Sequence, residues 1–330
     1  MEFVHEVVDA FPFTEPAHTV RRRESLLLAA PVAGFLSTWR DPSPIELVHF
    51  DSTYVPQEFS PPKGVYESEY VRVERQTMNN RQSFYHRNMD CDEMSYQVWG
   101  GRTLMTELGT VELAEGDFSQ IPVGVAHDNW GREEVHLLFY IPAGVEPQLA
   151  PAKSSELLIP PFEGWESTEQ NEVFGEGLGN PDGVMGAFPI DETLLLQEAQ
   201  NQPRRIAVLR PDDGDETSWL YKSDHVWIGR TRLDASDGST YRRHRNCDEV
   251  QYQVTGRRTV VSQLGTLHLE PGDFVRIPMG VAFTSIATER SEHIVLVSGS
   301  PLPQVSPPSA KGQTVGVDEL DELRPQALTS

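Results

Sequence analysis

Residues able to hold a catalytic metal are concentrated in one stretch of the sequence. His86 is followed by Asn88, Glu93 and, after a Pro-Val-Gly turn, His127. If the first part of this stretch is a β-strand, His86 and Asn88 point to one face of it and Arg87 points to the other. Two imidazoles and one carboxylate form the ligand set that leaves coordination positions open on iron(II). We therefore predict a catalytic metal site formed by His86, Glu93 and His127.

Asn88 is expected to act beside the metal and not as a ligand, because a neutral amide is a poor metal donor. It would either support a ligand through a hydrogen bond or face the substrate, and we count it among the candidate catalytic residues. Iron(II) is the expected metal, and manganese, nickel, zinc and copper remain alternatives. The alternative is a site without metal, in which the protein would have to supply a hydrogen-bond partner for each of the buried histidines and for Glu93.

A long internal repeat accompanies this site. Residues 91–126 and 247–282 share the strings Cys-Asp-Glu, Leu-Gly-Thr, Gly-Asp-Phe and Ile-Pro-x-Gly-Val-Ala. Three pairs of landmarks show the same offset of 156 positions (249 − 93, 272 − 116, 278 − 122): Glu93 and Glu249, Gly116 and Gly272, Pro122 and Pro278. The constant offset leaves no room for a net insertion, and the period is too long for a solenoid. The chain therefore contains a duplicated domain.

The second repeat lacks most of the ligand set. Phe283 stands in place of the second histidine, and Arg242 stands in place of the first if the repeats are aligned without a gap. A two-residue gap would instead put His244 in that place. In both alignments only His244 and Glu249 remain, and two ligands seldom hold a catalytic metal. We predict that the second repeat is structural, with His244 paired to Glu249 or to Arg242 in a buried polar cluster.

The elements that must position these residues are short strands. Apolar stretches are interrupted roughly every 8 to 12 residues by glycine turns such as Gly100-Gly101 and Glu115-Gly116-Asp117. This spacing predicts an all-β sandwich or small barrel in each repeat. One helix is predicted between the repeats, over residues 192–199, with Asp191 as its N-cap.

We predict five successive parts of the chain: an N-terminal segment (1–45), a first barrel with the metal site (46–145), a linker with the short helix (146–205), a second barrel with the degenerate site (206–300) and a C-terminal tail (301–330). The tail is rich in proline at its start and acidic towards its end. We expect it to be partly disordered or wrapped over a neighbour.

Composition restricts the classes of function. The 330 residues carry 27 Lys and Arg against 50 Asp and Glu, a formal net charge of -23. Such an acidic chain repels phosphate backbones and anionic lipids, so we expect no nucleic-acid partner and no membrane partner. No apolar run approaches the roughly 20 residues of a membrane helix, and no signal peptide is visible. Two cysteines are typical of a reducing compartment, and we expect a cytoplasmic homo-oligomer.

At the repeated motifs the sequence resembles the cupin superfamily. The first cupin motif, G-x5-HxH-x3,4-E-x6-G, is similar to the run His86-Arg87-Asn88, Glu93 and Gly100. The second, G-x5-PxG-x2-H-x3-N, is similar to the run Gly116, Pro122-Val123-Gly124 and His127. Both motifs occur again, in degenerate form, between Arg242 and Phe283. The resemblance implies a bicupin, an all-β chain of two jelly-roll (double-stranded β-helix) barrels.

A narrower resemblance covers Phe84-Tyr85-His86-Arg87-Asn88, with Glu93 downstream. This stretch is similar to the Tyr-His-Arg-Asn…Glu stretch of the homogentisate dioxygenase family, iron(II) enzymes that open the ring of a hydroquinone acid with dioxygen. Carried over, the ligands of that family fall on His86, Glu93 and His127. The resemblance implies a non-heme iron(II) dioxygenase that cleaves the ring of a small hydroxylated aromatic, similar to homogentisate, gentisate or hydroquinone, with O2 as co-substrate.

An aromatic acid would need a local cation in this acidic protein. Arg72, Arg75 and Arg81 precede the site, and a guanidinium offers a bidentate fork for a carboxylate. If one regular strand carries both Arg72 and Arg75, only one of them can face inward. Three aromatics are candidates for the wall of a ring-binding pocket, although an ordinary core position is the alternative for each: Tyr85, Tyr96 and Trp130.

Two other classes of function remain open. The same metal site could perform redox-neutral isomerase or lyase chemistry, with manganese, nickel or zinc as a Lewis acid. Such an enzyme would consume no oxygen. The chain could also be a non-enzymatic ligand-binding bicupin, in which case metal analysis would find the first barrel empty.

Overall fold

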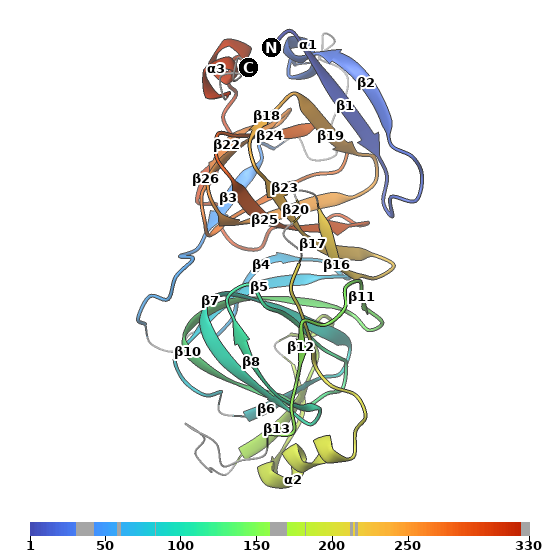
Figure 1. Cartoon of the computed structure of the whole chain (residues 1–330), viewed down its shortest axis with the longest axis vertical. Helices are drawn as coiled ribbons and strands as arrows, with labels where there is room; N and C mark the ends of the chain where they lie inside the picture. Colours follow the sequence, from blue (N-terminus) through green and yellow to red (C-terminus); the bar gives the residue numbers. More distant parts are fainter. Residues whose placement is uncertain are drawn as a thin grey trace.

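The chain folds into two β-barrels, one above the other in Figure 1. The computed structural model describes residues 1–30, 43–57, 61–82, 84–158, 170–181, 183–211, 214 and 217–324. The predicted all-β fold of two barrels is confirmed by the pairing of the strands. A continuous apolar core joins the barrels, because side chains of both pack in one cluster that includes Tyr96, Phe118, Tyr252 and Phe274.

The first barrel is built from an 11-stranded sheet. Its strands are β4 (Lys63–Glu67), β5 (Arg72–Met78), β6 (Phe84–Asn88), β7 (Cys91–Thr106), β8 (Gly109–Ala114), β9 (Phe118–Ile121), β10 (His127–Pro142), β12 (Lys153–Ser154), β13 (Gln170–Gly175), β14 (Val184–Ile190) and β15 (Ala207–Leu209). The long strands β7 and β10 pair antiparallel along most of their length. They form the wall that carries two of the predicted ligands.

The second barrel combines a 7-stranded and an 8-stranded sheet. Its strands are β1 (Phe3–Asp9), β2 (His18–Arg23), β3 (Glu46–His49), β11 (Glu146–Pro147), β16 (Ser218–Lys222), β17 (Val226–Leu233), β18 (Ser236–Asp237), β19 (Thr240–His244), β20 (Asp248–Thr255), β21 (Arg258–Ser262), β22 (Gly265–Leu269), β23 (Asp273–Ile277), β24 (Phe283–Ala287), β25 (Ser291–Ser298) and β26 (Ala310–Lys311). The helices are short: α1 (Glu24–Leu27), α2 (Glu192–Gln197), the 3-10 turn η1 (Glu198–Gln200) and α3 (Val317–Leu323).

The segments outside the repeats complete the barrels, and this differs from the predicted division of the chain. β1 pairs in parallel with β19 and β3 pairs with β23, so the described residues 1–30 and 43–49 belong to the second barrel. In the same way, β13 pairs in parallel with β6 and β15 pairs with β9, so the described residues 170–181 and 183–209 belong to the first barrel. The physical reason is that each repeat leaves strand edges that an additional segment must cover.

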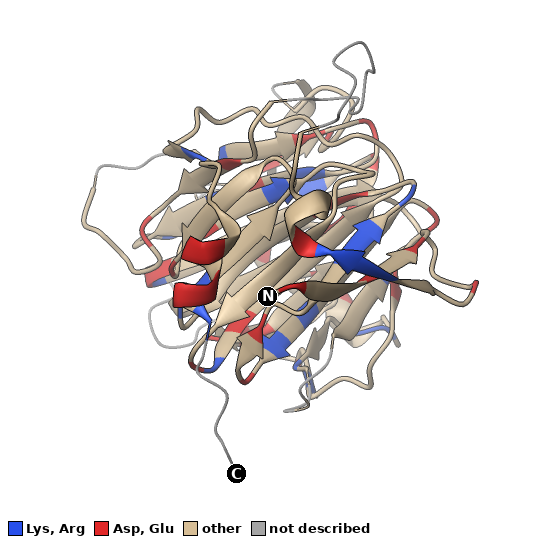
Figure 2. Ribbon diagram, turned by 90° about the horizontal axis from the view of Figure 1, so that it is seen from above, with Lys and Arg blue, Asp and Glu red and all other residues tan. Residues whose placement is uncertain are grey.

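The C-terminal residues pack on their own chain. β26 pairs with β3, and Leu302 and Leu320 are fully buried. Arg324 forms an ion pair of 2.5 Å with Glu24 of the N-terminal segment. Figure 2 shows the acidic residues of α3 and the basic residues of β2 at the same end of the molecule. The tail therefore docks on the second barrel as far as residue 324, in contrast to the expected disorder; residues 325–330 lie outside the described residues.

The predicted helix is confirmed as α2. Asp191 is its N-cap, and the Asp191 carboxylate accepts a hydrogen bond from the backbone N–H of Leu194 at 3.2 Å. Leu196 packs against Tyr85 and Met105 on the outside of the first barrel. Over the described part of the chain, every helix is too short and too polar to cross a membrane.

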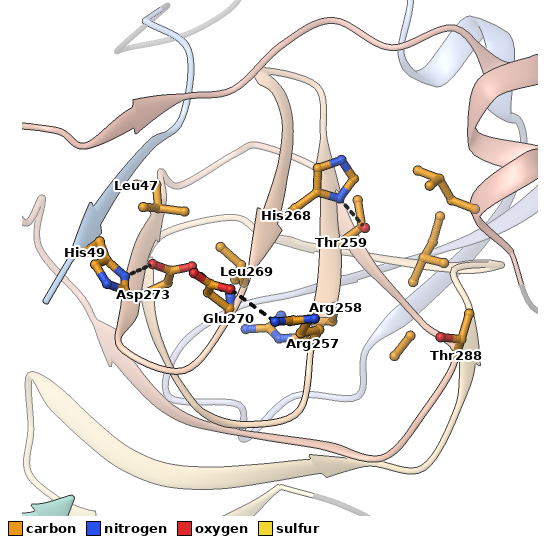
Figure 3. Close-up of a pocket in the computed structure, with 13 residues that line it drawn as sticks. Leu47, His49, Arg257, Arg258, Thr259, His268, Leu269, Glu270, Asp273 and Thr288 are labelled. Carbon is orange, nitrogen blue, oxygen red and sulfur yellow. Dashed lines mark hydrogen bonds and ion pairs between the residues drawn. The ribbon is translucent and has the colours of Figure 1, made fainter. Parts of the chain in front are cut away.

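Two cavities bear on function. One, of about 530 Å³, lies in the first barrel beside the predicted metal ligands. The other, of about 630 Å³, lies at the surface of the second barrel and is lined by residues that include the exposed His49 and His268 and the buried Arg258 (Figure 3).

Candidate metal centre

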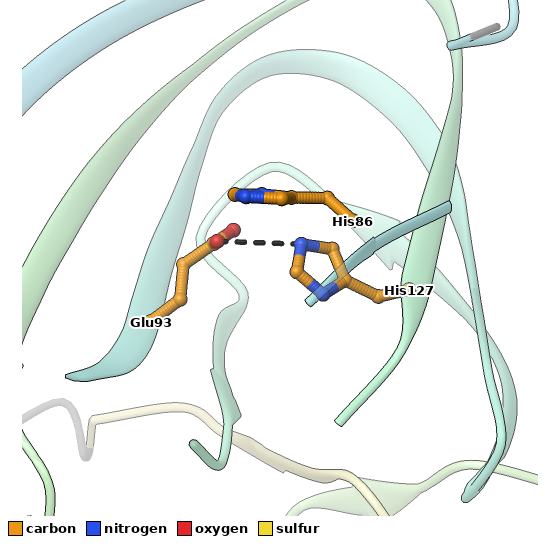
Figure 4. Close-up of side chains that lie close together, drawn as sticks. All are labelled: His86, Glu93 and His127. Atoms are coloured by element: carbon orange, nitrogen blue, oxygen red, sulfur yellow. Dashed lines mark ion pairs between the residues drawn. The ribbon is translucent and has the colours of Figure 1, made fainter. Parts of the chain in front are cut away.

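Three strands bring the predicted ligands together inside the first barrel (Figure 4). His86 lies on β6, Glu93 on β7 and His127 on β10, and one nitrogen or oxygen atom of each lies within 4.8 Å of the others. His127 Nε2 lies 3.3 Å from Glu93 Oε2, and the centroids of the two imidazole rings are 5.6 Å apart. His86 and His127 are paired directly across neighbouring strands, so their rings enter the same space. These three residues could hold a metal ion.

The charges of the three residues suit a divalent metal. Burial, together with the nearby His127, lowers the pKa of His86 to about 4, so this ring is neutral near pH 7. Burial alone would raise the pKa of Glu93, but its contacts with the histidines and Asn88 lower it to about 2. Burial alone would lower the pKa of His127, but attraction to Glu93 raises it. A metal bound here would take the place of the proton on His127 Nε2.

Neighbouring groups hold the ligands in position. Asn88 Nδ2 donates a hydrogen bond to Glu93 Oε2 at 2.8 Å, so the amide supports this carboxylate and does not line the cavity. His127 Nδ1 donates to the carbonyl oxygen of Val125 at 3.1 Å, which leaves Nε2 as the ligand atom. A β-carbon at Gly175 would lie 3.0 Å from the Nε2 atom of His86, so the glycine makes room for that ring. This donor set and its supports fit a divalent transition metal.

The second barrel aligns with the first without a gap. Arg242 pairs directly with Phe283 across neighbouring strands, as His86 pairs with His127 in the first barrel. Arginine and phenylalanine therefore replace both histidine ligands, and His244 takes the place of the supporting asparagine. Among the residues that the structure describes, the second barrel contains no group of potential ligands like that of the first.

His244 is the centre of a buried ion cluster. His244 Nε2 lies 2.7 Å from Glu249 Oε2, and His244 Nδ1 lies 2.5 Å from Asp9 Oδ1. Burial alone would lower the pKa of His244, but the hydrogen bonds to Asp9 and Glu249 raise it to about 9. The pair with Glu249 was one of the two predicted pairings. Asp9 was not predicted, because it reaches the cluster from the N-terminal strand β1.

We expect His244→Ala to destabilise the protein by about 3 kcal/mol, because it leaves buried carboxylates without their counter-charge. A raised pKa means that the contribution of His244 is complete below about pH 6.5 and is lost as the pH rises through about 9. Chemical denaturation at about pH 7 and about pH 10 should therefore show a smaller difference from the wild type at the higher pH. His18→Ala, on the exposed strand β2, is the control and should change little at either pH.

The cavity beside the ligands contains two of the three predicted arginines. Arg72 and Arg81 line it, whereas Arg75 does not. Arg75 Nη2 donates to the carbonyl oxygen of Asp51 at 2.9 Å, and its guanidinium lies over the ring of Phe50. Arg72 and Arg75 thus occupy opposite faces of β5, as their parity requires. Arg75 therefore faces away from the cavity, contrary to the prediction that it could bind the substrate.

The three predicted aromatics lie outside this cavity, so their expected place in its wall is also corrected. Tyr85 donates from its hydroxyl to Glu192 at 2.7 Å on the outside of the barrel. Tyr96 packs in the core between the barrels. Trp130 packs beside α2, with the guanidinium of Arg132 over its ring. Strand alternation explains all three, since each differs in parity from the ligand on its own strand.

Other residues that line the cavity were missed in the sequence. Glu74 and Gln76 follow Arg72 at alternate positions of β5, and Leu138 and Tyr140 alternate in the same way along β10. Alternation from Arg72 was the signal that could have revealed the first pair. The second pair required knowledge that β10 lies between β5 and β7.

Comparisons with known proteins find solved structures of similar fold, and three of them share 8 to 15% sequence identity with this chain. No protein-family model matches the chain, and no curated protein matches it. A cupin 2 conserved barrel domain protein from Leptotrichia buccalis has a TM-score of 0.47 and 8% identity, covering 74% of this chain and 92% of that chain. A salicylate 1,2-dioxygenase mutant from Pseudoaminobacter salicylatoxidans has a TM-score of 0.43 and 15% identity, covering 74% and 79%. A deletion mutant of oxalate decarboxylase from Bacillus subtilis has a TM-score of 0.43 and 12% identity, covering 82% and 81%. The fold assignment therefore rests on the strand pairing and the repeat of this chain.

Proposed function

We propose that the chain is a metal-dependent dioxygenase that acts on a small hydroxylated aromatic acid. The observation that carries the proposal is the convergence of His86, Glu93 and His127 beside a cavity of about 530 Å³ whose wall also contains arginine. A cavity of this size suits a small molecule. One space would thus serve both the metal and the carboxylate of the substrate.

Iron(II) is the metal that this proposal assigns. When bound, it would supply Lewis acidity and one-electron chemistry towards dioxygen and a hydroxylated ring. The chain itself keeps the ligands in place through the amide of Asn88 and the carbonyl of Val125. Phe84 and Leu138 add apolar surface to the cavity and limit the access of water.

Arg72 is the residue that we assign to the substrate carboxylate. Its Nη1 atom is buried and has no hydrogen-bond partner among the described residues. The guanidinium lies 4.4 Å from the ring centroid of Tyr140, and Nε lies 3.0 Å from Glu74 Oε1. Arg81, by contrast, is already paired with two buried carboxylates. Arg72 therefore retains the greater capacity to bind an anion.

Glu74 is placed to carry a proton in the same cavity. Burial raises the pKa of Glu74 above its ordinary value, although the charge of Arg72 opposes this rise. Its Oε2 atom is buried and has no hydrogen-bond partner in the described part of the chain. We assign to Glu74 the acid–base role for which the sequence suggested no candidate.

Oxygen uptake tests the proposal. The iron-loaded protein is mixed with gentisate, homogentisate, catechol or hydroquinone in an oxygen electrode, and ring opening is followed by the loss of aromatic absorbance. We expect oxygen consumption that matches ring loss, and none with Glu93→Gln, which removes the ionised ligand. Substrate turnover without oxygen consumption would instead identify a redox-neutral isomerase or lyase. Failure to bind any metal would identify a ligand-binding protein.

A further inference from the structure

A buried glutamate organises a polar cluster inside the first barrel. Glu134 accepts hydrogen bonds from His136 Nδ1 at 2.9 Å and from Gln97 Nε2 at 2.8 Å. Burial alone would raise the pKa of Glu134, but His136 and the positive charge of the buried Arg102 lower it. A single carboxylate therefore satisfies a histidine and an amide and balances a buried cation.

The second barrel keeps three members of this cluster and lacks the fourth. Gln253 lies opposite His293, as Gln97 lies opposite His136 in the first barrel. Arg258 is the counterpart of the buried arginine in the repeat. Ser291 occupies the position of Glu134. A β-carbon on Gly100 would lie 3.1 Å from the Cα of Glu134, and a β-carbon on the equivalent Gly256 would lie 2.9 Å from the Cα of Ser291. The second barrel has lost the carboxylate and retained its partners.

Three polar atoms of this cluster in the second barrel are buried without a partner among the residues that the structure describes. They are Arg258 Nη2, Ser291 Oγ and His293 Nδ1. All three side chains are more than nine-tenths buried. His293 Nδ1 corresponds to the nitrogen that bonds the carboxylate in the first barrel. The other contacts of Arg258 are with neutral groups, Gln253 Oε1 at 2.7 Å and Ser285 Oγ at 2.8 Å.

A buried guanidinium without a counter-ion is costly, because it has lost its hydration and does not release its proton. The carboxylate of Glu249 acts on Arg258 electrostatically, but it is hydrogen-bonded to His244 and Gln251. A water molecule could satisfy the unpartnered atoms but would not neutralise the charge. A small anion would do both.

We propose that the second barrel binds a small monocarboxylate, of the size of formate or acetate, in the place of the missing glutamate side chain. Arg258 Nη2 would donate to one carboxylate oxygen, and Ser291 Oγ and His293 Nδ1 would donate to the other. Ser291 and His293 lie two residues apart on β25, so both side chains face the same side of the strand. Arg258 also lines the pocket of about 630 Å³ (Figure 3).

Thermal unfolding in sodium formate tests this site with variants of Ser291. The ionic strength is held constant with the salt of a bulky sulfonate buffer. We expect the unfolding temperature of the wild type to rise with formate and then to saturate. Ser291→Glu restores the carboxylate within the chain, so it should unfold at a higher temperature without formate and lose the response. Ser291→Ala, the matched comparison, leaves the place of the carboxylate vacant but removes one of the three donors, so it should still respond to formate, at higher formate concentrations than the wild type.

The comparison between these two variants decides the result, because any response that comes from the first barrel is common to both. Equal responses of Ser291→Ala and Ser291→Glu, or no response in the wild type, would overturn the proposal. A second measurement does not depend on how the variants fold. In spectra of wild-type protein with isotope-labelled histidine, formate should shift the Nδ1 resonance of His293 and leave that of His136 in place. An unmoved His293 resonance would likewise overturn it.

Discussion

His127→Ala is expected to lose most of the bound metal and, with it, the activity. The two remaining ligands would be His86 and Glu93, and the neutral amide of Asn88 cannot act as a third because it is bonded to the glutamate. Loss of a group that merely supports a ligand costs about 10- to 100-fold in metal affinity, so loss of the ligand itself should cost at least about 100-fold. Metal analysis of the dialysed protein by mass spectrometry measures the effect.

The matched control is His244→Ala, the same substitution of an equally buried histidine in the second barrel. It should retain the metal of the wild type and lose only stability. Circular dichroism of both variants checks that each is folded at the temperature of the metal analysis. Full retention of metal by His127→Ala, or an equal loss from both variants, would show that the metal lies elsewhere.

Arg72→Gln is expected to weaken the binding of an aromatic carboxylate by about 1.5 to 3 kcal/mol, roughly tenfold to a hundredfold or more. The reason is that a charged fork with a free nitrogen is replaced by a neutral amide in the same cavity. Gentisate, which carries a carboxylate, and hydroquinone, which does not, are titrated into the protein at equal metal occupancy. Only the affinity for gentisate should fall.

Arg75→Gln is the control for this change, because Arg75 is carried by the same strand but points away from the cavity. It should bind gentisate as the wild type does. Equal affinities of the wild type and Arg72→Gln for gentisate would mean that the substrate is neutral or is held by another group. Unchanged metal content in both variants separates this result from damage to the metal centre.

The candidate ligand set could be identified in the sequence because it depends on local spacing. His86 and Asn88 share one face of a short strand, and Arg87 is turned outward to pair with Glu107 and Glu172. The cap at Asp191 likewise required only the residues that follow it. The repeat also showed that the second half lacks the equivalent histidines. It did not decide whether the two repeats align with or without a gap, which required the pairing of Arg242 with Phe283.

Contacts between distant segments could not be predicted in this way. Alternation shows that Arg72 and Arg75 face opposite sides, but not which side is the inside of the barrel. Asp9 and His244, which lie in contact, are 235 positions apart in the sequence. Arg81 pairs both with Asp128 on β10 and with Glu192 at the start of α2, and so joins these two elements. No local pattern specifies such partners, because they exist only after the sheets have closed.

The sequence by itself determined the duplication, the all-β architecture and the residue types of the candidate metal site, since each depends on short-range period or on identity at a fixed offset. The tertiary structure decided the boundaries of the barrels, by pairing β1 with β19 and β13 with β6. It also decided that Arg72 lines the cavity with its Nη1 atom unpaired among the described residues, whereas Arg81 is neutralised by buried carboxylates. The physical reason is that the free energy of burying a charge depends on every group packed around it, and strand closure brings those groups from distant parts of the chain.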